Sequence, residues 1–197
     1  MTVQLARRLM TVADYEQLIE TGVLGEDDRV ELLNGEIVPM SPIGSRHAAC
    51  VKRINQLLVQ QLGGRAIVGV QDPIRLNDLS EPEPDLSVMA FRVDYYADQH
   101  PEPSDVLLLI EVADTSAQHD RTVKVPLYAQ AGIPEVWLVD LAAGHVDAFR
   151  HPAPAGYLLR RRHLPGQTIS LAEGLDLSVA VDGIVGPGSE RSVAYGI

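Results

Sequence analysis

The sequence predicts an α/β fold in which helices flank a mixed β-sheet, with additional antiparallel strands at the C-terminus. A strand, a helix and a strand follow one another over residues 105–139, an order typical of a right-handed crossover between parallel strands. Asn34-Gly35 lies between two apolar runs, which indicates a tight β-hairpin. After residue 144, short β-prone segments alternate with Pro and Gly turns, as in antiparallel sheets.

The first elements are a helix, a hairpin and a longer helix. The first helix begins at Thr11, a good N-cap residue, and ends at Gly22. The hairpin lies within residues 29–40 and carries Glu31, which faces either a cleft or solvent. Apolar residues at helical spacing predict the second helix over residues 45–62.

The central strands carry two acids near their ends. A strand over residues 66–70 is followed by a stiff proline-containing segment, which delivers Asp85 to the head of the next strand. The apolar strand 105–112 carries Glu111 close to its end. A helix follows over residues 120–131, and Pro126 within it predicts a looser entry before Lys124.

Length and composition indicate one domain of 197 residues, of which 46 % are hydrophobic. We expect its core to span about residues 11–141, followed by an antiparallel extension over 142–182 and a flexible tail over 183–197. No apolar run approaches the roughly 20 residues that span a bilayer, and the N-terminus does not resemble a signal peptide. The single cysteine, Cys50, excludes an internal disulfide and a cysteine-rich zinc site, so a cytoplasmic protein is expected.

The formal net charge of −11 argues against bulk electrostatic affinity for nucleic acid. It leaves local contact open, because an acidic metal site would contribute part of this charge. The only dense basic run is Arg160-Arg161-Arg162. A solvated edge strand is the preferred interpretation of this run, and a phosphate-contacting patch is the alternative.

Asp85 and Glu111 are the candidates for chemistry, because acids on adjoining strands can share one hard cation. An ionised carboxylate at the end of an apolar run costs several kcal/mol unless a cation meets it. The carbonyl of Val112 could add a third oxygen, and Glu31 is a possible third acid. Lys124 could orient a water and offset negative charge in a phosphoryl transition state. The alternative is a strand-end Glu111 that reaches water or an arginine.

Four ordered stretches resemble the PD-(D/E)xK nuclease superfamily, and in particular its Uma2-like branch of predicted restriction endonucleases, a domain of unknown function. The stretches are residues 30–42, 83–88, 110–112 and 124–140. Pro84-Asp85 alone is a weak motif, whereas the ordered set is fairly specific. The resemblance implies a restriction-endonuclease-like core and Mg²⁺-dependent cleavage of DNA phosphodiesters, with Mn²⁺ as a possible substitute.

The resemblance also implies roles for individual residues. Asp85 and Glu111 would ligate the metal, and Glu31 would match the extra acid from the N-terminal part of the fold. The superfamily lysine normally stands two residues after the Glu, where this chain has Ala113. Lys124 on the following helix matches the lysine that replaces it in this branch.

His47 and Gln71 are the candidates for substrate binding. His47 lies in the first turn of the second helix, within reach of an acidic cleft, and could contact a phosphate. Gln71 follows a strand and could line the same cleft. The more ordinary interpretations are a polar residue near a helix start and a satisfied strand-edge amide. Tyr128 and Trp137 are expected in the core.

Three functions fit these observations. The first is a Mg²⁺-dependent DNA endonuclease, expected to be a homodimer because a two-fold pair of sites suits cleavage of both strands. The C-terminal antiparallel segments would form its interface. The second is a catalytically weak or inactive interaction protein that kept the fold. The third is a hydrolase of small phosphate esters, which would have a closed pocket.

Overall fold

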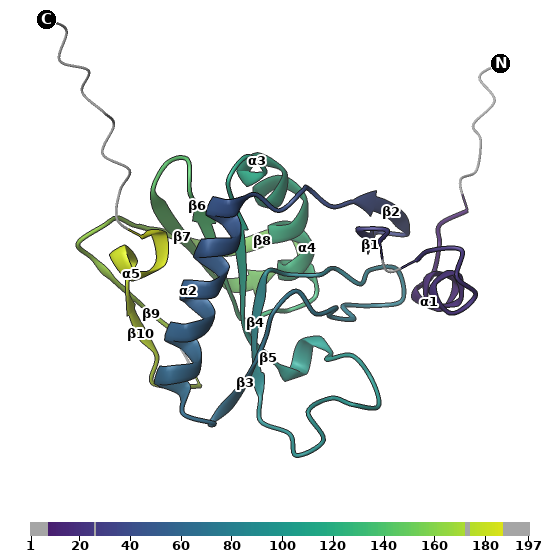
Figure 1. Ribbon diagram of the computed structural model, residues 1–197, viewed down its shortest axis with the longest axis horizontal. Coiled ribbons are helices and arrows are strands. Elements are labelled where there is room, and N and C mark those ends of the chain that lie inside the picture. The colour runs from purple at the N-terminus through teal and green to yellow at the C-terminus, as the bar shows by residue number, and fades with distance from the viewer. Residues whose placement is uncertain (1–7, 26, 172–173, 187–197) are drawn as a thin grey trace, which may run out of the picture.

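The computed structural model describes residues 8–25, 27–171 and 174–186, and within them six strands form one mixed sheet (Figure 1). The order across this sheet is β3-β4-β5-β6-β7-β8. The strand bounds are Ala66–Gly69, Leu86–Ala90, Val106–Ala113, Glu135–Asp140, His145–Ala153 and Gly156–His163. β5 and β6 are parallel, and every other neighbouring pair is antiparallel. The predicted α/β class and the parallel crossover are therefore confirmed.

The crossover between β5 and β6 passes through an irregular helical segment. A short turn, α3 (Ala117–His119), leads into a π-helical turn, η2 (Asp120–Lys124), and then into α4 (Val125–Gln130). Pro126 is the second residue of α4 and has no N–H to donate to the preceding turn, which is the π-helical turn η2. The looser entry predicted before Lys124 is thus helical, but wider than an α-helix.

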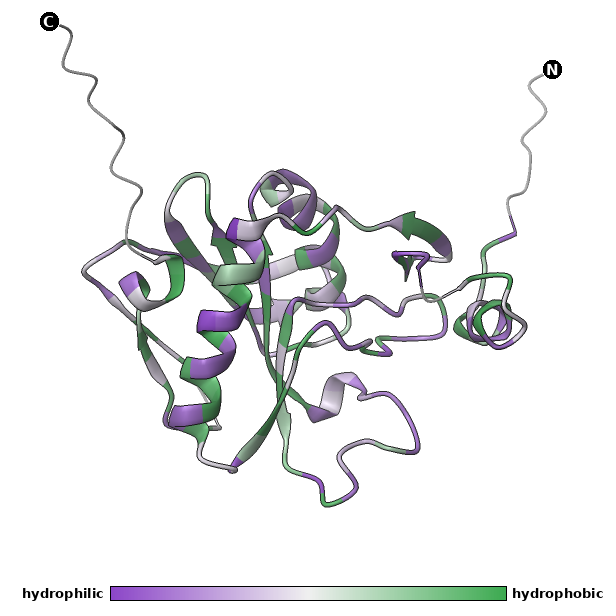
Figure 2. Cartoon of the chain, viewed as in Figure 1, coloured by the Kyte–Doolittle hydropathy of each residue, from purple (hydrophilic) through white to green (hydrophobic). Residues whose placement is uncertain are grey.

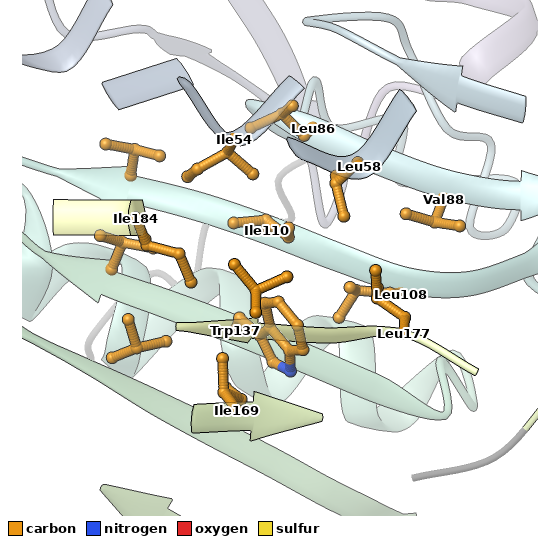
Figure 3. Packing of buried hydrophobic residues seen from close by; sticks show 14 of the residues in the cluster. Ile54, Leu58, Leu86, Val88, Leu108, Ile110, Trp137, Ile169, Leu177 and Ile184 are labelled. Atoms are coloured by element: carbon orange, nitrogen blue, oxygen red, sulfur yellow. The ribbon is translucent and has the colours of Figure 1, made fainter. Parts of the chain in front are cut away.

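Helix α2, helix α5 and the two-stranded ribbon β9–β10 contribute to the core on one face of the sheet. Their bounds are Ser45–Leu62, Val181–Val185, Thr168–Ser170 and Ser178–Ala180. Figure 3 shows Ile110 and Trp137 of the central strands among side chains of α2, β9 and α5, such as Leu58, Ile169 and Ile184. Hydrophobic and hydrophilic residues alternate along α2 (Figure 2), as expected for a helix with one face on a sheet.

Helix α5 lies where the sequence predicts a tail. Val181 and Ile184 are fully buried in the core, so the tail does not begin at Gly183. This helix has only five residues, which is too short for its apolar residues to show a helical period in the sequence. The remainder of the predicted tail, residues 187–197, lies outside the described ranges.

The opposite face of the sheet packs against α4, because alternate residues of a strand point to opposite faces. Leu109 and Leu138 are buried there beside Tyr128 of α4. Glu111 follows Leu109 by two positions, so it projects from this same face at the end of β5.

The N-terminal helix α1 (Val12–Glu20) packs with a hairpin of β1 (Val30–Leu33) and β2 (Glu36–Pro39). Asn34 and Gly35 have φ of 51° and 78°, the left-handed conformation that a type I′ hairpin turn requires. Figure 1 shows α1 and this hairpin at the opposite end of the molecule from β9 and β10. No helix in the described ranges is both long and apolar enough to cross a membrane.

Candidate active site

A cavity of about 300 Å³ lies between the β1–β2 hairpin, the start of α2, the ends of β4 and β5, and the π-helical turn η2. All the residues that the sequence singled out for a site line it. They are Glu31, His47, Gln71, Asp85, Glu111, Val112 and Lys124. The fold therefore brings together side chains from six separate segments.

The antiparallel pairing of β4 and β5 brings Asp85 to the end of β5. Leu86 is the partner of Ile110, so Asp85, one residue earlier, lies beside the next residues of β5. The backbone N–H of Val112 donates to Asp85 Oδ2 at 2.8 Å. The same register puts Asp85 opposite Glu111, so both side chains lie on one face of the sheet, and both line the cavity.

Lys124 joins two acids that come from different parts of the chain. Its Nζ lies 3.0 Å from Glu31 Oε2 and 3.0 Å from Glu111 Oε1. All three side chains are almost completely buried. Burial alone would lower the pKa of Lys124, but Glu111 and Glu31 outweigh burial and raise it, so the ammonium stays charged at neutral pH.

Glu111 has a second buried partner in Tyr128, whose hydroxyl donates to Glu111 Oε1 at 2.5 Å. Burial raises the pKa of Glu111, and Lys124 opposes that rise. The sequence predicted Tyr128 as a core residue, and the side chain is indeed fully buried. Its contact with Glu111 was missed, although Tyr128 follows Lys124 by four residues and such positions share one helix face.

Asp85 is held by donors on both of its oxygens. His47 Nε2 lies 3.0 Å from Oδ2, the same oxygen that accepts from Val112. Gln71 donates from Nε2 to Oδ1 at 3.2 Å, and its backbone is left-handed, with φ of 56°. The hydrogen bond to Asp85 raises the pKa of His47, against the effect of burial. His47 and Gln71 therefore orient the acid within the cavity.

Glu31 is fixed by the backbone of a neighbouring segment. The N–H of Glu83 donates to Glu31 Oε2 at 3.1 Å, the same oxygen that contacts Lys124. Glu83 also lines the cavity, and nothing in the sequence except its place before Pro84 indicates this role. Asp120, the first residue of η2, accepts a hydrogen bond from Ser116 Oγ at 2.7 Å.

The oxygen atoms around Asp85 and Glu111 suit a hard divalent cation. Two carboxylates and the adjacent carbonyl of Val112 match the oxygen ligands that Mg²⁺ prefers. The hydrogen bond and ion pair of Glu111 both use Oε1, which leaves Oε2 for a cation. Among the described residues, no three His, Cys, Asp or Glu side chains are grouped to hold a metal. An ion here would therefore complete its shell with water or substrate oxygens.

Comparisons with known proteins show similarity both in sequence and in fold. The sequence profile of the Uma2 family, described as "Putative restriction endonuclease", matches residues 12–182. A crystal structure of "a putative nuclease belonging to DUF820" from Anabaena variabilis has a similar fold, with a TM-score of 0.68. The two chains are 14 % identical, and the match covers 89 % of this chain and 97 % of the other. The comparison with curated proteins gave no match.

Proposed function

Because the chain belongs to the Uma2 family, described as "Putative restriction endonuclease", we propose that it is a Mg²⁺-dependent endonuclease that hydrolyses phosphodiester bonds of DNA. The observation that carries this proposal is the buried Lys124 ammonium, 3.0 Å from two acids, in a cavity that Asp85 also lines. A nuclease needs carboxylates for a metal and a fixed cation beside the phosphate, and this cavity has both.

Asp85, Glu111 and the carbonyl of Val112 would hold the metal. When bound, Mg²⁺ would polarise a phosphate oxygen and make a nearby water more acidic. His47 and Gln71 keep both oxygens of Asp85 aimed at one point, since each donates to or contacts that carboxylate. Such fixed donors need little rearrangement when substrate arrives.

Lys124 acts by its charge. Its raised pKa means that the ammonium keeps its proton at neutral pH, so it is not a general base. A charged ammonium in a buried cavity stabilises negative charge that develops on a phosphoryl group. Glu31, which accepts a hydrogen bond from the backbone N–H of Glu83, holds the ammonium in position.

Cleavage of plasmid DNA in the presence of Mg²⁺ tests the proposal. We expect Asp85→Asn and Glu111→Gln to abolish cleavage while the circular dichroism spectrum stays unchanged. Asp98→Asn is the matched control, because Asp98 is exposed and does not line the cavity. Wild-type cleavage rates in both cavity variants would end the proposal.

A catalytically inactive interaction protein is the second candidate. It is favoured by Ala113, which stands where the usual motif lysine would be, and by the ion pairs that already engage Lys124 and Glu111. Calorimetry with Mg²⁺ separates the two candidates. Metal binding without cleavage of DNA or RNA would assign the inactive protein.

A homodimer is part of the proposal, since two sites related by a two-fold axis suit cleavage of both strands of a duplex. Its interface would involve the antiparallel C-terminal strands.

A further inference from the structure

Three arginines converge on one buried carboxylate outside the cavity. Asp147 is fully buried, and Arg162 Nε lies 3.0 Å from its Oδ1. Its Oδ2 lies 2.6 Å from Arg160 and 3.4 Å from Arg121. We name Arg121, Arg160 and Arg162 the arginine cluster. Burial alone would raise the pKa of Asp147, but the hydrogen bonds from Arg162 and Arg160 lower it, so the carboxylate is ionised.

The arginine cluster carries more positive charge than its acids cancel. Among the residues that the structure describes, Asp140, 3.7 Å from Arg121, is the other acid in contact with the cluster, so three guanidinium groups face two carboxylates. His145 also contacts Asp147, at 3.3 Å. In a chain whose formal net charge is −11, this is a local excess of cation. A purely structural ion pair would match its charges; an excess of cation favours an anion as a further partner.

The guanidinium groups are also accessible and oriented. The side chains of Arg160 and Arg162 are 43 % and 49 % exposed, although the guanidinium group of each also contacts the buried Asp147. The Arg160 guanidinium carbon lies 5.7 Å from the centre of the Phe149 ring. Nε of Arg121 is buried, and no partner for it is found among the described residues. Fixed, half-exposed guanidinium groups suit the oxygens of a phosphate.

The sheet register puts this cluster in line with the proposed active site. Glu111 is the partner of Leu138, Leu138 of Asp147, and Asp147 of Arg162. Partners in neighbouring strands point to the same face, so Glu111 and Arg162 lie on one face, three strand spacings apart. At about 4.8 Å a spacing, this is about 14 Å, a distance that a short stretch of nucleic-acid backbone can span.

The π-helical turn η2 links the two places directly. Arg121 and Lys124 both belong to it, three positions apart. Lys124 points to Glu111, whereas Arg121 points to Asp140 and Asp147. A phosphate bound by the arginine cluster would therefore fix the position of a second phosphate at the cavity.

We propose that the arginine cluster is a binding site for a backbone phosphate of nucleic acid, a few nucleotides from the phosphate that is cleaved. This inference rests on the proposed function, because it names the part of the protein that holds the same substrate. The sequence favours a solvated edge strand for the basic run on β8. In this proposal the three arginines of the run do not share one role. Arg160 and Arg162 contact phosphate, and Arg161 points to the other face.

Arg161 supplies the matched control. It is the partner of Ala148, whose side chain belongs to the core on the α2 face, and it is exposed. Arg161→Gln thus changes the net charge as much as Arg160→Gln does, on the same strand. Arg160→Gln leaves Arg162 and Arg121 on Asp147, so the fold should be kept. Arg162→Gln likewise removes one cation and leaves Arg160 and Arg121 on Asp147.

The test is the fluorescence anisotropy of a labelled 30-base-pair DNA duplex, in EDTA so that no metal-dependent cleavage occurs. Loss of one phosphate contact lowers the slope of log affinity against log salt by about 0.9, and weakens binding about eightfold at 0.1 M NaCl. We expect this change in Arg160→Gln and in Arg162→Gln. We expect Arg161→Gln to bind like wild type.

Equal affinities in Arg160→Gln and Arg161→Gln would overturn the inference, as would an unchanged salt slope in both cluster variants. Stabilisation by 10 mM inorganic phosphate that depends on the cluster, with DNA affinity unaffected, would assign a free anion and also overturn it. The proposed nuclease activity fails separately, when plasmid DNA is not cleaved in Mg²⁺. Cluster-dependent DNA binding without cleavage would therefore support the inference while the nuclease proposal fails.

Discussion

Replacing Lys124 by methionine is the most informative perturbation of the site. Methionine is close to lysine in length, so the change removes the charge and little volume. The ammonium makes two contacts of 3.0 Å with the buried acids Glu31 and Glu111. Without it, two carboxylates share a buried site with no cation, and the Tyr128 hydroxyl is the one donor left on Glu111 Oε1 among the described contacts.

The expected loss of stability follows from that geometry. Removing one partner of a buried ion pair costs about 3–5 kcal/mol, because the other partner is left uncompensated. For a domain of this size, each kcal/mol lowers Tm by about 2–4 °C, so Lys124→Met should lower Tm by about 6–20 °C. Loss of a fixed charge at the transition state should reduce kcat by about 10²–10³-fold.

Thermal unfolding followed by circular dichroism in EDTA measures the first effect, and plasmid cleavage in Mg²⁺ measures the second. Lys52→Met is the control, because Lys52 is the other lysine of the chain and lies exposed on α2. Adding Glu31→Gln to Lys124→Met removes one stranded charge, so it should recover part of the Tm and none of the activity. A Tm for Lys124→Met within about 2 °C of the Lys52→Met control would refute the reasoning.

Three further predictions concern stability and assembly. Burial, with Glu16 nearby, raises the pKa of Glu81 to about 7 from 4.5, so the folded state binds a proton more readily than the unfolded state. Stability should therefore fall by up to about 3 kcal/mol as pH rises from 4.5 to 7, and Glu81→Gln should flatten this dependence in urea unfolding at several pH values. Gly35→Ala should lower the urea midpoint, because Gly35 has φ of 78° and an added Cβ would lie 2.6 Å from Leu9 Cβ; an unchanged midpoint would contradict the hairpin geometry. Sedimentation at micromolar concentration should give a dimer, and a monomer there would count against the proposed C-terminal interface.

The fold was predictable where the signal was local. The Asn34-Gly35 pair specifies its turn by itself, since both residues need positive φ. The apolar run of β5, the interrupted helix and the apolar strand β6 predict a parallel crossover because the intervening chain is long enough for one. The nearness of Asp85 and Glu111 was also predictable, because both residues stand at the ends of adjoining strands. Helix α5 was not predicted, because five residues are too few to show a helical periodicity of apolar side chains.

The partners of the charged residues could not be predicted, because they depend on register and not on pattern. Glu31 reaches Lys124 through the docking of the hairpin, which a bridge between Leu32 and Glu81 helps to fix. Asp147 meets Arg162 because β7 and β8 pair in one particular register, and a shift by one residue would turn the arginine to the other face. In the sequence the same arginine is one of three consecutive cations with no visible counter-charge. The division of that run between two faces is therefore a property of strand pairing, and it is what makes Arg161 a control for its neighbours.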